Sequence, residues 1–589
     1  MKELFDYYTQ ELEKNKTQVN RLKGRLRLLA TVRLAVFFCA FSLGLVFRST
    51  PLIVLPIAVV GLTVFLWLVK TYENAKTALR FFKELVKINE EELRVLHYDL
   101  EGLETGAEYI DPEHAYSNDL DLFGEKSFFQ YLNRTGLTKG RALLAALVCK
   151  NDCDAITAKQ ETVDELSQRP EWRHYFLAQA KLVDEETDLD AVVDWLKGYR
   201  PFVPNIFHWL PWVFFSLFIV LTMLIMVMDL PLDYIGYLVL IGLGITARSY
   251  RQISRLARRA DQVKSIFKQY SLLLQHIENA DFQAPQLRFQ QQRLKTTDGF
   301  ASTCMTRFSK LLDIMDYNNN IFYIVLGNGT FLGALWSAFR IETWIRRYGH
   351  QVESWFEVIA FFDAHVSLGN FAFNHPRYVY PILHDGPEVL KCTDLGHPLI
   401  RPEHSVNNPV TIGDTHFLII TGSNMAGKST YLRSVGLSLV MANLGLPVCA
   451  HTYFYRPVKL ITSMRSIDAL HKGDSYFMAE LKRLRKVVDH LVHDAHFVLL
   501  DEILKGTNST DKANGSKRFV QKLVNMGATG IIATHDLSLC DIADDLPNVG
   551  NYHFDASIKD NELYFDYRLK EGVSQTMNAS FLLEKMDLV

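Results

Sequence analysis

Four long apolar stretches, arranged in two pairs, constrain the fold of this chain more than any other feature of its sequence. They run from Leu28 to Phe47, Leu52 to Val69, Trp209 to Met228 and Leu232 to Ala247. A helix needs about 20 apolar residues to cross the hydrocarbon core of a bilayer, so each stretch is close to the length of one span. A short segment joins the two members of each pair. The sequence therefore predicts two transmembrane helical hairpins, over residues 28–70 and 201–248.

Basic residues flank the apolar stretches on one side only. Lysine and arginine gather in residues 14–27, 70–80 and 248–259, whereas the short loops inside the pairs hold Arg48 and two aspartates. Short loops rich in lysine and arginine stay in the cytosol. We therefore expect an integral protein of the bacterial inner membrane, with both termini and the soluble body in the cytosol. The alternative, four buried core helices, explains the paired order poorly.

The remaining segments are predicted to be cytosolic. Helical periodicity dominates the middle of the chain, where β-branched runs are few. A basic row from Arg251 to Lys268 follows the second hairpin directly, so contact with anionic lipid explains it better than DNA binding does. The predicted units are a basic N-terminus (1–27), a connecting helix (71–112), a helical core in two parts (113–200 and 249–394) and a C-terminal domain (395–589).

Overall charge and cysteine content argue against a globally basic nucleic-acid-binding protein and against a zinc site. The net charge of −3 gives no global attraction to nucleic acid, so any surface that binds a polyanion must be local. Cys149 and Cys153 are the closest cysteine pair, and no neighbouring cysteines or histidines complete a zinc site. Reduced thiols in a cytosolic body are the better interpretation.

The stretch TGSNMAGKST, residues 421–430, predicts a phosphate-binding loop. It fits G-x-x-x-x-G-K-S and lies between a strand-like run, THFLIITG, and a helical run, STYLRSVGLSLVMANLG. In this context the glycines let backbone N–H groups point at phosphate oxygens, and the helix N-terminus adds a positive dipole end. Lys428 supplies a mobile positive charge, and Ser429 supplies a hydroxyl for Mg²⁺. The residues expected to bind ATP are Gly422, Ser423, Asn424, Met425, Ala426, Gly427, Lys428, Ser429 and Thr430.

Two further apolar runs end in residues suited to ATP hydrolysis. HFVLLDE ends in Asp501 and Glu502, and TGIIATH ends in His535. Asp501 is placed to hold Mg²⁺ with Ser429, Glu502 to orient or deprotonate the attacking water, and His535 to sense the γ-phosphate. Each could be a simple strand-end turn, but three strand ends with related chemistry favour a site. Ser475 precedes a helix expected from about Tyr476 to His490, where it can cap the helix or bind an anion.

These motifs together resemble the MutS family of DNA mismatch-repair ATPases, within the ABC class. ITGSNMAGKSTYLRSVGL resembles T-G-P-N-M-x-G-K-S-T, with Ser423 in place of proline. GDSYFMAEL resembles G-x-S-T-F-x-x-E-(M/L), with Tyr476 in place of threonine. LGHPLI, LLDEILKGTNSTD and ATHD resemble other ATPase segments, and LFGEKSFFQYLNRTGLTKGRALLAALV resembles the start of the helical core, or lever. The resemblance runs from about Asp119 to the end of the chain, interrupted around the second hairpin.

The resemblance implies a homodimer that works through its ATPase domains. In that family the signature serine of one subunit reaches the nucleotide of the other, so Ser475 is expected to act in trans. Asn424 and Met425 are expected to line the nucleotide loop. ATP binding would close the pair and hydrolysis would release it. Leu504 and Lys505 stand where the family has a Gly-Arg pair, which puts the coupling between subunits in doubt.

The departures from the family concern DNA. Membrane spans occupy the place of the mismatch-reading domain, so we expect a member without it. The run Phe82-Lys83-Glu84 matches the F-x-E reading motif by chance, inside a helix beside the membrane. The second hairpin falls where family members insert the clamp that grips DNA.

Two functions follow from these features. The favoured one is a membrane-anchored MutS-like ATPase that acts on DNA, with ATP as its only small-molecule substrate. The alternative is a membrane-bound mechanical ATPase that acts on lipid or protein. An ABC transporter is a poor fit because the L-S-G-G-Q signature is absent. The expected fold is a mostly α-helical core, a C-terminal α/β P-loop domain and four transmembrane helices in two hairpins.

Overall fold

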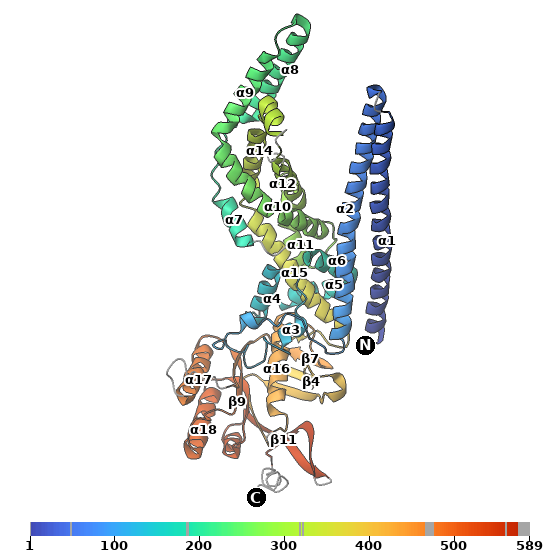
Figure 1. Ribbon diagram of the computed structural model, residues 1–589. Coiled ribbons are helices and arrows are strands. Elements are labelled where there is room, and N and C mark those ends of the chain that lie inside the picture. Colours follow the sequence, from blue (N-terminus) through green and yellow to red (C-terminus); the bar gives the residue numbers. More distant parts are fainter. Residues whose placement is uncertain are drawn as a thin grey trace.

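The chain forms three tiers: two helical columns, a helical middle and a C-terminal α/β domain (Figure 1). Both columns project from the same side of the helical middle, away from the C-terminal domain. The predicted combination of a mostly helical chain with a C-terminal α/β region is confirmed. The computed structural model describes residues 2–47, 50–183, 188–316, 320, 323–423, 425–465, 476–559 and 562–574.

The first column is a pair of antiparallel helices, α1 (Lys2–Val46) and α2 (Pro51–Val95). Each has 45 residues, which corresponds to a length of about 67 Å. The helices approach closely, because a Cβ atom on Gly61 would lie 2.8 Å from the Cβ of Ala40. Both helices contain a stretch long and apolar enough to cross a membrane, and at most 6% of that stretch is buried inside the protein.

Both helices of this column extend beyond the predicted apolar stretches. Residues 2–27, predicted as a separate N-terminal segment, continue α1 without a break. The predicted connecting helix over 71–112 continues α2 but ends at Val95. The chain then turns through Tyr98, Gly102 and Gly106, whose φ angles are 60°, 77° and 66°. A right-handed helix cannot contain such residues, so the polar tail of the predicted helix is mostly a loop.

The foot of the first column is fixed to the helical middle by a buried polar cluster. Glu92 of α2 is 1% exposed. Its carboxylate accepts hydrogen bonds from Arg134 Nε at 2.6 Å, Asn370 Nδ2 at 3.0 Å and Asn374 Nδ2 at 2.8 Å. The hydroxyl of Tyr8, on α1, donates to Asn374 Oδ1 at 2.7 Å. One cluster therefore joins α1, α2 and the last turn of a core helix.

The second column is shorter and differs from the predicted pair of spans. Its hairpin consists of α8 (Leu210–Met228) and α9 (Asp233–Arg248). Within the described residues, α1, α2 and α8 are long and apolar enough to cross a membrane. Helix α9 has 16 residues and falls short of that length. A bent segment, Tyr323–Phe331 followed by Gly333–Tyr348, passes the same test only if it is taken as one element.

The helical middle surrounds one large apolar core. Aromatic residues are prominent in it, with Phe267, Phe308 and Trp355 at 0–1% exposure. A small hairpin, β1 (Lys295–Thr296) and β2 (Gly299–Phe300), joins two of its helices. The helices of this tier are α3 (Phe128–Leu132), α4 (Thr138–Cys149), α5 (Ile156–Ser167), α6 (Pro170–Ala180), α7 (Leu189–Lys197), α10 (Tyr250–Glu278), α11 (Pro285–Gln292), α12 (Ala301–Asp316), α14 (Gly333–Tyr348) and α15 (Val352–Asn374).

The C-terminal domain is built on a sheet of six strands in the order β12-β11-β6-β10-β9-β8. All neighbours pair in parallel except β11 and β12. One apolar core lies where α16 packs against the sheet, and another where α17 and α18 pack. The elements are β6 (Phe417–Gly422), α16 (Lys428–Asn443), β8 (Lys459–Ser463), α17 (Tyr476–His493), β9 (His496–Asp501), α18 (Ser509–Asn525), β10 (Thr529–Ala533), α19 (Ile542–Asp545), β11 (Val549–Lys559) and β12 (Glu562–Glu571).

A second, four-stranded sheet adjoins this domain on the side of the helical middle. Its order is β3-β7-β4-β5. Residues of β4, β5 and β7 share an apolar core with α16 and α15, so this sheet connects the nucleotide-binding region to the base of the helical tier. The strands are β3 (Ile382–Leu383), β4 (Glu388–Leu395), β5 (Asn408–Gly413) and β7 (Thr452–Tyr455).

Candidate nucleotide site

The phosphate loop lies between the last residue of β6 and the first residue of α16, as the sequence predicts. Gly422 and Gly427 have φ angles of 146° and 103°, a region that favours glycine. A side chain at Gly422 would also collide with the carbonyl oxygen of Phe554, 2.5 Å from the position of an added Cβ. The loop conformation therefore requires glycine at the positions that the motif specifies.

Lys428 lies at the centre of the loop and is 5% exposed. Its ammonium group donates to the carbonyl oxygens of Gly422 at 2.8 Å and Ser423 at 3.0 Å, and lies 3.3 Å from Nε2 of His535. Burial lowers the pKa of Lys428, and the charges of Glu502 and Asp501 oppose that shift. The carbonyl groups that accept these hydrogen bonds are neutral, so they leave the positive charge of the buried ammonium group uncompensated. A phosphate group can compensate this charge.

Ser429 and Asp501 form the pair expected to hold Mg²⁺. The hydroxyl of Ser429 donates to Asp501 Oδ2 at 2.6 Å. The other carboxylate oxygen, Oδ1, is buried and has no hydrogen-bond partner among the described residues. Burial raises the pKa of Asp501 despite the hydrogen bond from Ser429. An unsatisfied carboxylate oxygen beside a hydroxyl fits Mg²⁺, which takes one or two protein oxygens together with phosphate oxygens and water.

Glu502 and His535 meet beside this pair. Glu502 Oε1 lies 2.8 Å from His535 Nε2, and Lys505 Nζ lies 3.5 Å from the other oxygen of Glu502. The hydrogen bond from His535 contributes most to lowering the pKa of Glu502, to about 2. A carboxylate this acidic remains charged and can orient a water molecule. Orientation and deprotonation of the water both stay predictions for Glu502.

A cleft of about 490 Å³ lies along the phosphate loop. Residues 425–430 and Glu502 belong to its lining. Ile400 and Val406, from the segment between β4 and β5, and Tyr567 of β12 also line it, and the ring of Tyr567 lies 3.2 Å from the position of a Cβ added to Gly427. Polar groups for phosphates together with apolar and aromatic side chains for a base match the chemistry of a nucleotide. The sequence analysis did not identify the apolar side chains of the cleft, because they carry no motif.

Helix α17 is joined to the loop that follows Glu502. Glu480 Oε1 accepts hydrogen bonds from the backbone N–H groups of Leu504 at 2.5 Å and Lys505 at 3.3 Å. The side chain of Leu504 is buried, at 6% exposure, in the core beneath α17 and α18. The two residues that depart from the family pattern thus have defined roles here, one in packing and one in an ion pair with Glu502.

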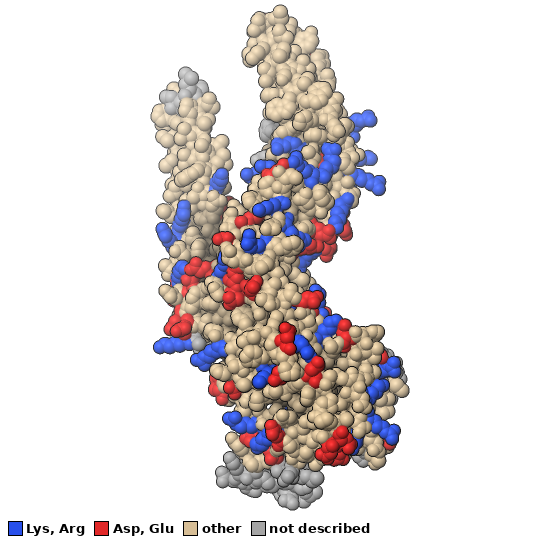
Figure 2. Space-filling model, turned by 180° about the vertical axis from the view of Figure 1, so that it is seen from behind, with Lys and Arg blue, Asp and Glu red and all other residues tan. Residues whose placement is uncertain are grey.

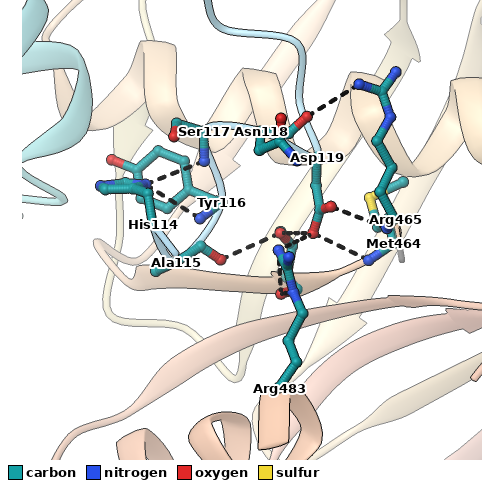
Figure 3. Close-up of polar contacts among 10 residues, drawn as sticks. His114, Ala115, Tyr116, Ser117, Asn118, Asp119, Met464, Arg465 and Arg483 are labelled. Carbon is teal, nitrogen blue, oxygen red and sulfur yellow. Dashed lines mark hydrogen bonds and ion pairs between the residues drawn. The ribbon is translucent and has the colours of Figure 1, made fainter. Parts of the chain in front are cut away.

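Asp119 connects the same helix to the segment that precedes the helical middle (Figure 3). Its buried carboxylate accepts from Thr462 Oγ1 at 2.6 Å and from Arg483 Nη2, on α17, at 2.7 Å. The backbone N–H groups of Met464 and Arg465 also donate to it, both at 3.0 Å. A displacement of α17 would therefore act directly on the base of the helical tier. Residues this far apart in sequence gave no signal from which their contact could be predicted.

The predicted site residues fall into three groups. Lys428, Ser429, Asp501, Glu502 and His535 come together, at the ends of β6, β9 and β10. Met425 is 80% exposed at the loop surface, and Ala426 and Thr430 line the cleft. Asn424 and Ser475 lie outside the described residues. The helix predicted to follow Ser475 is present and runs from Tyr476 to His493.

Comparison with known proteins places the similarity in this domain. Residues 418–584 match the family model MutS domain V. The chain is 32% identical over 216 residues to the DNA mismatch repair protein MSH4 of Arabidopsis thaliana, covering 36% of this chain and 27% of that protein. It is 34% identical over 193 residues to the human MutS protein homolog 4, covering 31% and 20%.

A bacterial relative shows the same extent of similarity. The chain is 29% identical over 240 residues to the DNA mismatch repair protein MutS of Macrococcus caseolyticus, covering 39% of this chain and 27% of that protein. The matched part thus spans about a quarter of the length of these relatives. The matches support a relationship to the MutS family that rests on the nucleotide-binding domain.

Proposed function

We propose that the protein is a Mg²⁺-dependent ATPase, anchored in a membrane, that couples ATP binding and hydrolysis to a switch between two subunits. The observation that carries this proposal is the convergence of β6, β9 and β10 on one loop. Their ends bring a buried lysine, a serine–aspartate pair and a glutamate–histidine pair together at one edge of the sheet. Phosphoryl transfer to water needs these functions and little covalent chemistry from the protein.

Each residue has a defined part in this reaction. Lys428 binds the β- and γ-phosphates, and Ser429 and Asp501 hold Mg²⁺, which neutralises charge on the phosphates when bound. Glu502 orients the attacking water, and His535 keeps Glu502 charged and in position. The apolar and aromatic side chains of the cleft, from Ile400, Val406 and Tyr567, receive the adenine base.

The membrane anchor is proposed from the surface of the two columns. Below the grey tip of the first column, and over the outer part of the second, the face in Figure 2 shows side chains other than Lys, Arg, Asp or Glu, and charged side chains begin farther down. Phe41, Leu62 and Val227 illustrate the apolar exposure, at 59%, 60% and 82%. Apolar surface this extensive requires lipid or another protein. Basic residues lie at the ends of the columns nearest the body. We therefore propose that the columns are embedded in a bacterial inner membrane and that the body lies in the cytosol.

The subunit switch rests on the resemblance to the MutS family. We propose a homodimer in which Ser475 of one subunit acts at the nucleotide of the other. The links from α17 to Lys505 and to Asp119 support the idea that closure at the nucleotide reaches the helical tier.

DNA is the proposed partner of the switch. The relatives are named for DNA mismatch repair, and the matched region is their shared nucleotide-binding domain. A role in mismatch repair or in handling another DNA structure follows for this chain as a proposal. The exposed arginines of α10, such as Arg251, Arg255 and Arg258, form a local basic surface. Their position beside the hairpin favours anionic lipid as the contact of this surface, and DNA is the alternative.

One observation favours a second candidate, a mechanical ATPase acting on lipid or protein. The column made by α8 and α9 takes the position at which the family inserts its DNA clamp, and its surface is apolar. Such a column cannot neutralise phosphates, which DNA affinity requires. In this candidate the switch moves the membrane column itself.

Hydrolysis is tested with detergent-solubilised full-length protein. The wild type is expected to hydrolyse ATP only with Mg²⁺, and Glu502→Gln is expected to retain ATP binding while hydrolysis falls about 100-fold or more. The control is Asp489→Asn on α17, which removes a carboxylate whose side chain is 50% exposed and should behave as the wild type. Hydrolysis by Glu502→Gln at the normal rate would remove the assigned role of this residue.

The salt dependence of DNA binding distinguishes between the two proposed kinds of partner. Duplex DNA binding through phosphate contacts weakens steeply between about 50 and 200 mM salt, by about 10³-fold for six contacts. Salt-sensitive binding that changes with ATP supports DNA as the partner. Absence of binding at the lower salt, with ATP hydrolysis intact, supports the mechanical alternative.

A further inference from the structure

The bent segment beside the second hairpin is an element that the sequence analysis assigned to the soluble core. It consists of a π-helical turn, η4 (Tyr323–Gly327), a short helix, α13 (Asn328–Phe331), and then α14. The helix axes on either side of Leu332 differ by 75°. No charged residue occurs between Asp316 and Arg340. In Figure 1 the yellow-green turn above α14 lies next to α9.

This segment contacts α9 backbone to backbone. A Cβ atom added to Gly242 of α9 would lie 2.8 Å from the carbonyl oxygen of Asn328 and 2.9 Å from that of Gly329. A Cβ atom added to Gly329 would lie 2.6 Å from Val239 Cγ1. Small residues that allow such approach are typical of helix contacts inside membranes. The contact is near the middle of α9, about 10 Å from its Arg248 end at about 1.5 Å per residue.

Aromatic side chains join the same segment to α8. The ring of Phe331 lies 5.1 Å from the ring of Trp212 and 5.9 Å from that of Phe215, between centroids. Trp336 of α14 lies 5.4 Å from Phe331, and the guanidinium group of Arg340 lies 4.8 Å from the centre of the Trp336 ring. Tryptophan and arginine at this level are typical of the boundary between lipid and water.

The polar groups of the segment are satisfied from within the protein. Asn328 is 5% exposed and its Oδ1 accepts from the backbone N–H of Ala334 at 2.8 Å. The hydroxyl of Thr330 donates to the carbonyl of Leu326 at 2.6 Å, and that of Ser337 to the carbonyl of Gly333 at 2.9 Å. The break itself, at Leu332, is 0% exposed. The point at which the helix is interrupted is therefore buried in protein, where an irregular backbone is tolerated at membrane depth.

The outer face of the segment is apolar and exposed. Val325 is 41% exposed and Leu326 is 60% exposed. Neither is among the described residues that form the large core of the helical middle. Whatever covers this face must therefore be apolar. The neighbouring hairpin of α8 and α9 also exposes an apolar surface.

We propose that residues 323–339 form a re-entrant membrane segment, which enters the bilayer from the cytosolic side, contacts α9 and returns to the cytosol as α14. Its partner is the acyl chains of lipid. The second column is then anchored by three membrane segments, namely α8, α9 and residues 323–339. The last of these continues into the remainder of α14, which belongs to the core of the helical middle. This inference rests on the proposed membrane anchoring by α8 and α9.

Lipid crosslinking tests the inference separately from the anchoring. The photoreactive residue p-benzoylphenylalanine is placed singly at Leu326, at Val227 in the tip of α8, or at Val492 in α17. All three side chains are exposed, at 60%, 82% and 67%, so a folded chain can accept the larger group. Full-length protein is reconstituted in phosphatidylcholine–phosphatidylglycerol vesicles and irradiated, and lipid adducts are measured by mass spectrometry.

The three positions give distinguishable outcomes. The inference predicts adducts at Leu326 comparable to those at Val227 and about tenfold above those at Val492, because acyl chains surround only membrane-embedded positions. Adducts at Val227 with Leu326 at the Val492 level would overturn the re-entrant segment and leave the anchoring intact. Absence of adducts at both Val227 and Leu326 would overturn the anchoring and the inference together.

Discussion

The nucleotide site and the foot of the first column both bury charged groups, but they satisfy them differently. Glu92 at the foot receives three hydrogen bonds, one of them from the charged Arg134. Burial alone would raise the pKa of Glu92, yet the charge and hydrogen bond of Arg134 and the amide of Asn374 bring it below its ordinary value. In the nucleotide site, burial raises the pKa of Asp501 and leaves one of its oxygens without a partner among the described residues.

The difference separates a structural charge from a functional one. At the foot, the buried charges find their hydrogen-bond and ion-pair partners within the chain, so they stabilise the folded state. In the nucleotide site, the buried charges obtain their partners only when a ligand binds, so they lower the stability of the ligand-free protein. Substitutions at the foot should therefore lower the stability of the fold, whereas substitutions in the nucleotide site should lower ATP hydrolysis without lowering stability.

The largest expected effect is on catalysis. Lys428→Ala should abolish measurable ATP binding and lower hydrolysis by at least about 100-fold, because it removes the cation that meets the phosphates. Its melting temperature without nucleotide should not fall, since the lysine is buried and its hydrogen bonds to described residues go to neutral carbonyls and a histidine. Lys522→Ala, at an exposed position of α18, is the matched control and should hydrolyse ATP normally. A stable Lys428→Ala protein that still binds ATP would contradict the assignment of the loop.

The next effect is on stability alone. Glu92→Gln leaves Arg134 buried without its anionic partner and should lower the free energy of unfolding by about 3–5 kcal/mol. Because the pKa of Glu92 is lowered on folding, its stabilisation is present above the ordinary carboxyl pKa and is lost as pH falls through the folded value. The difference in melting temperature from wild type should therefore shrink in acid.

The control for Glu92→Gln is two residues away. Glu90 pairs with Lys16 at 3.1 Å on the surface, with 51% of its side chain exposed. Glu90→Gln should cost at most about 1 kcal/mol. Equal destabilisation by the two substitutions would show that the buried cluster does not fix the column.

A smaller loss of stability is expected at the contact near the middle of α9, in the second column. Gly242→Leu places a side chain against the backbone of residues 328–329 and should cost about 1–3 kcal/mol, measured by thermal unfolding in detergent. Gly244→Leu in the same helix is the control, because an added Cβ there meets nothing within 4 Å. ATP hydrolysis per folded molecule should change in neither variant. A cost at Gly244 equal to that at Gly242 would contradict the close contact.

The smallest effect has the opposite sign. Asp501→Asn should stabilise the nucleotide-free protein by about 0.5–2 kcal/mol, while Mg²⁺-dependent hydrolysis is lost. The carboxylate is destabilising above its raised folded pKa and harmless below the ordinary value, so the gain should be greatest at neutral pH and vanish as pH falls. Melting temperatures at several pH values measure this. A loss of stability at neutral pH would show that the Asp501 carboxylate stabilises the fold, as that of Glu92 is expected to do.

The predictable part of the molecule is the part whose chemistry is local. The phosphate loop could be located because its backbone needs glycine at Gly422 and Gly427, and because strands and helix surround it within a few residues. The meeting of Asp501, Glu502 and His535 could be predicted because parallel strands end at the same edge of a sheet.

The part that escaped prediction depends on contacts between distant residues. Glu92, Arg134 and Asn374 meet only after α2 and α15 have packed together. The segment 323–331 was missed because glycine, asparagine and threonine interrupt its apolar run, although they permit its contact with α9. The helix α1 begins well before the predicted apolar stretch, because its charged half differs from its apolar half in composition but not in helical conformation. The predicted connecting helix was too long, because its polar tail after Val95 gave no signal of the turn through Tyr98, Gly102 and Gly106.

The shared direction of the two columns limits how two copies can associate. If both copies are rooted in one bilayer, a rotation that relates them must keep both sets of columns pointing the same way. Only a twofold axis parallel to the membrane normal does so. The surfaces that meet then lie on lateral flanks of the molecule, and the end farthest from the lipid stays outside the contact between the copies.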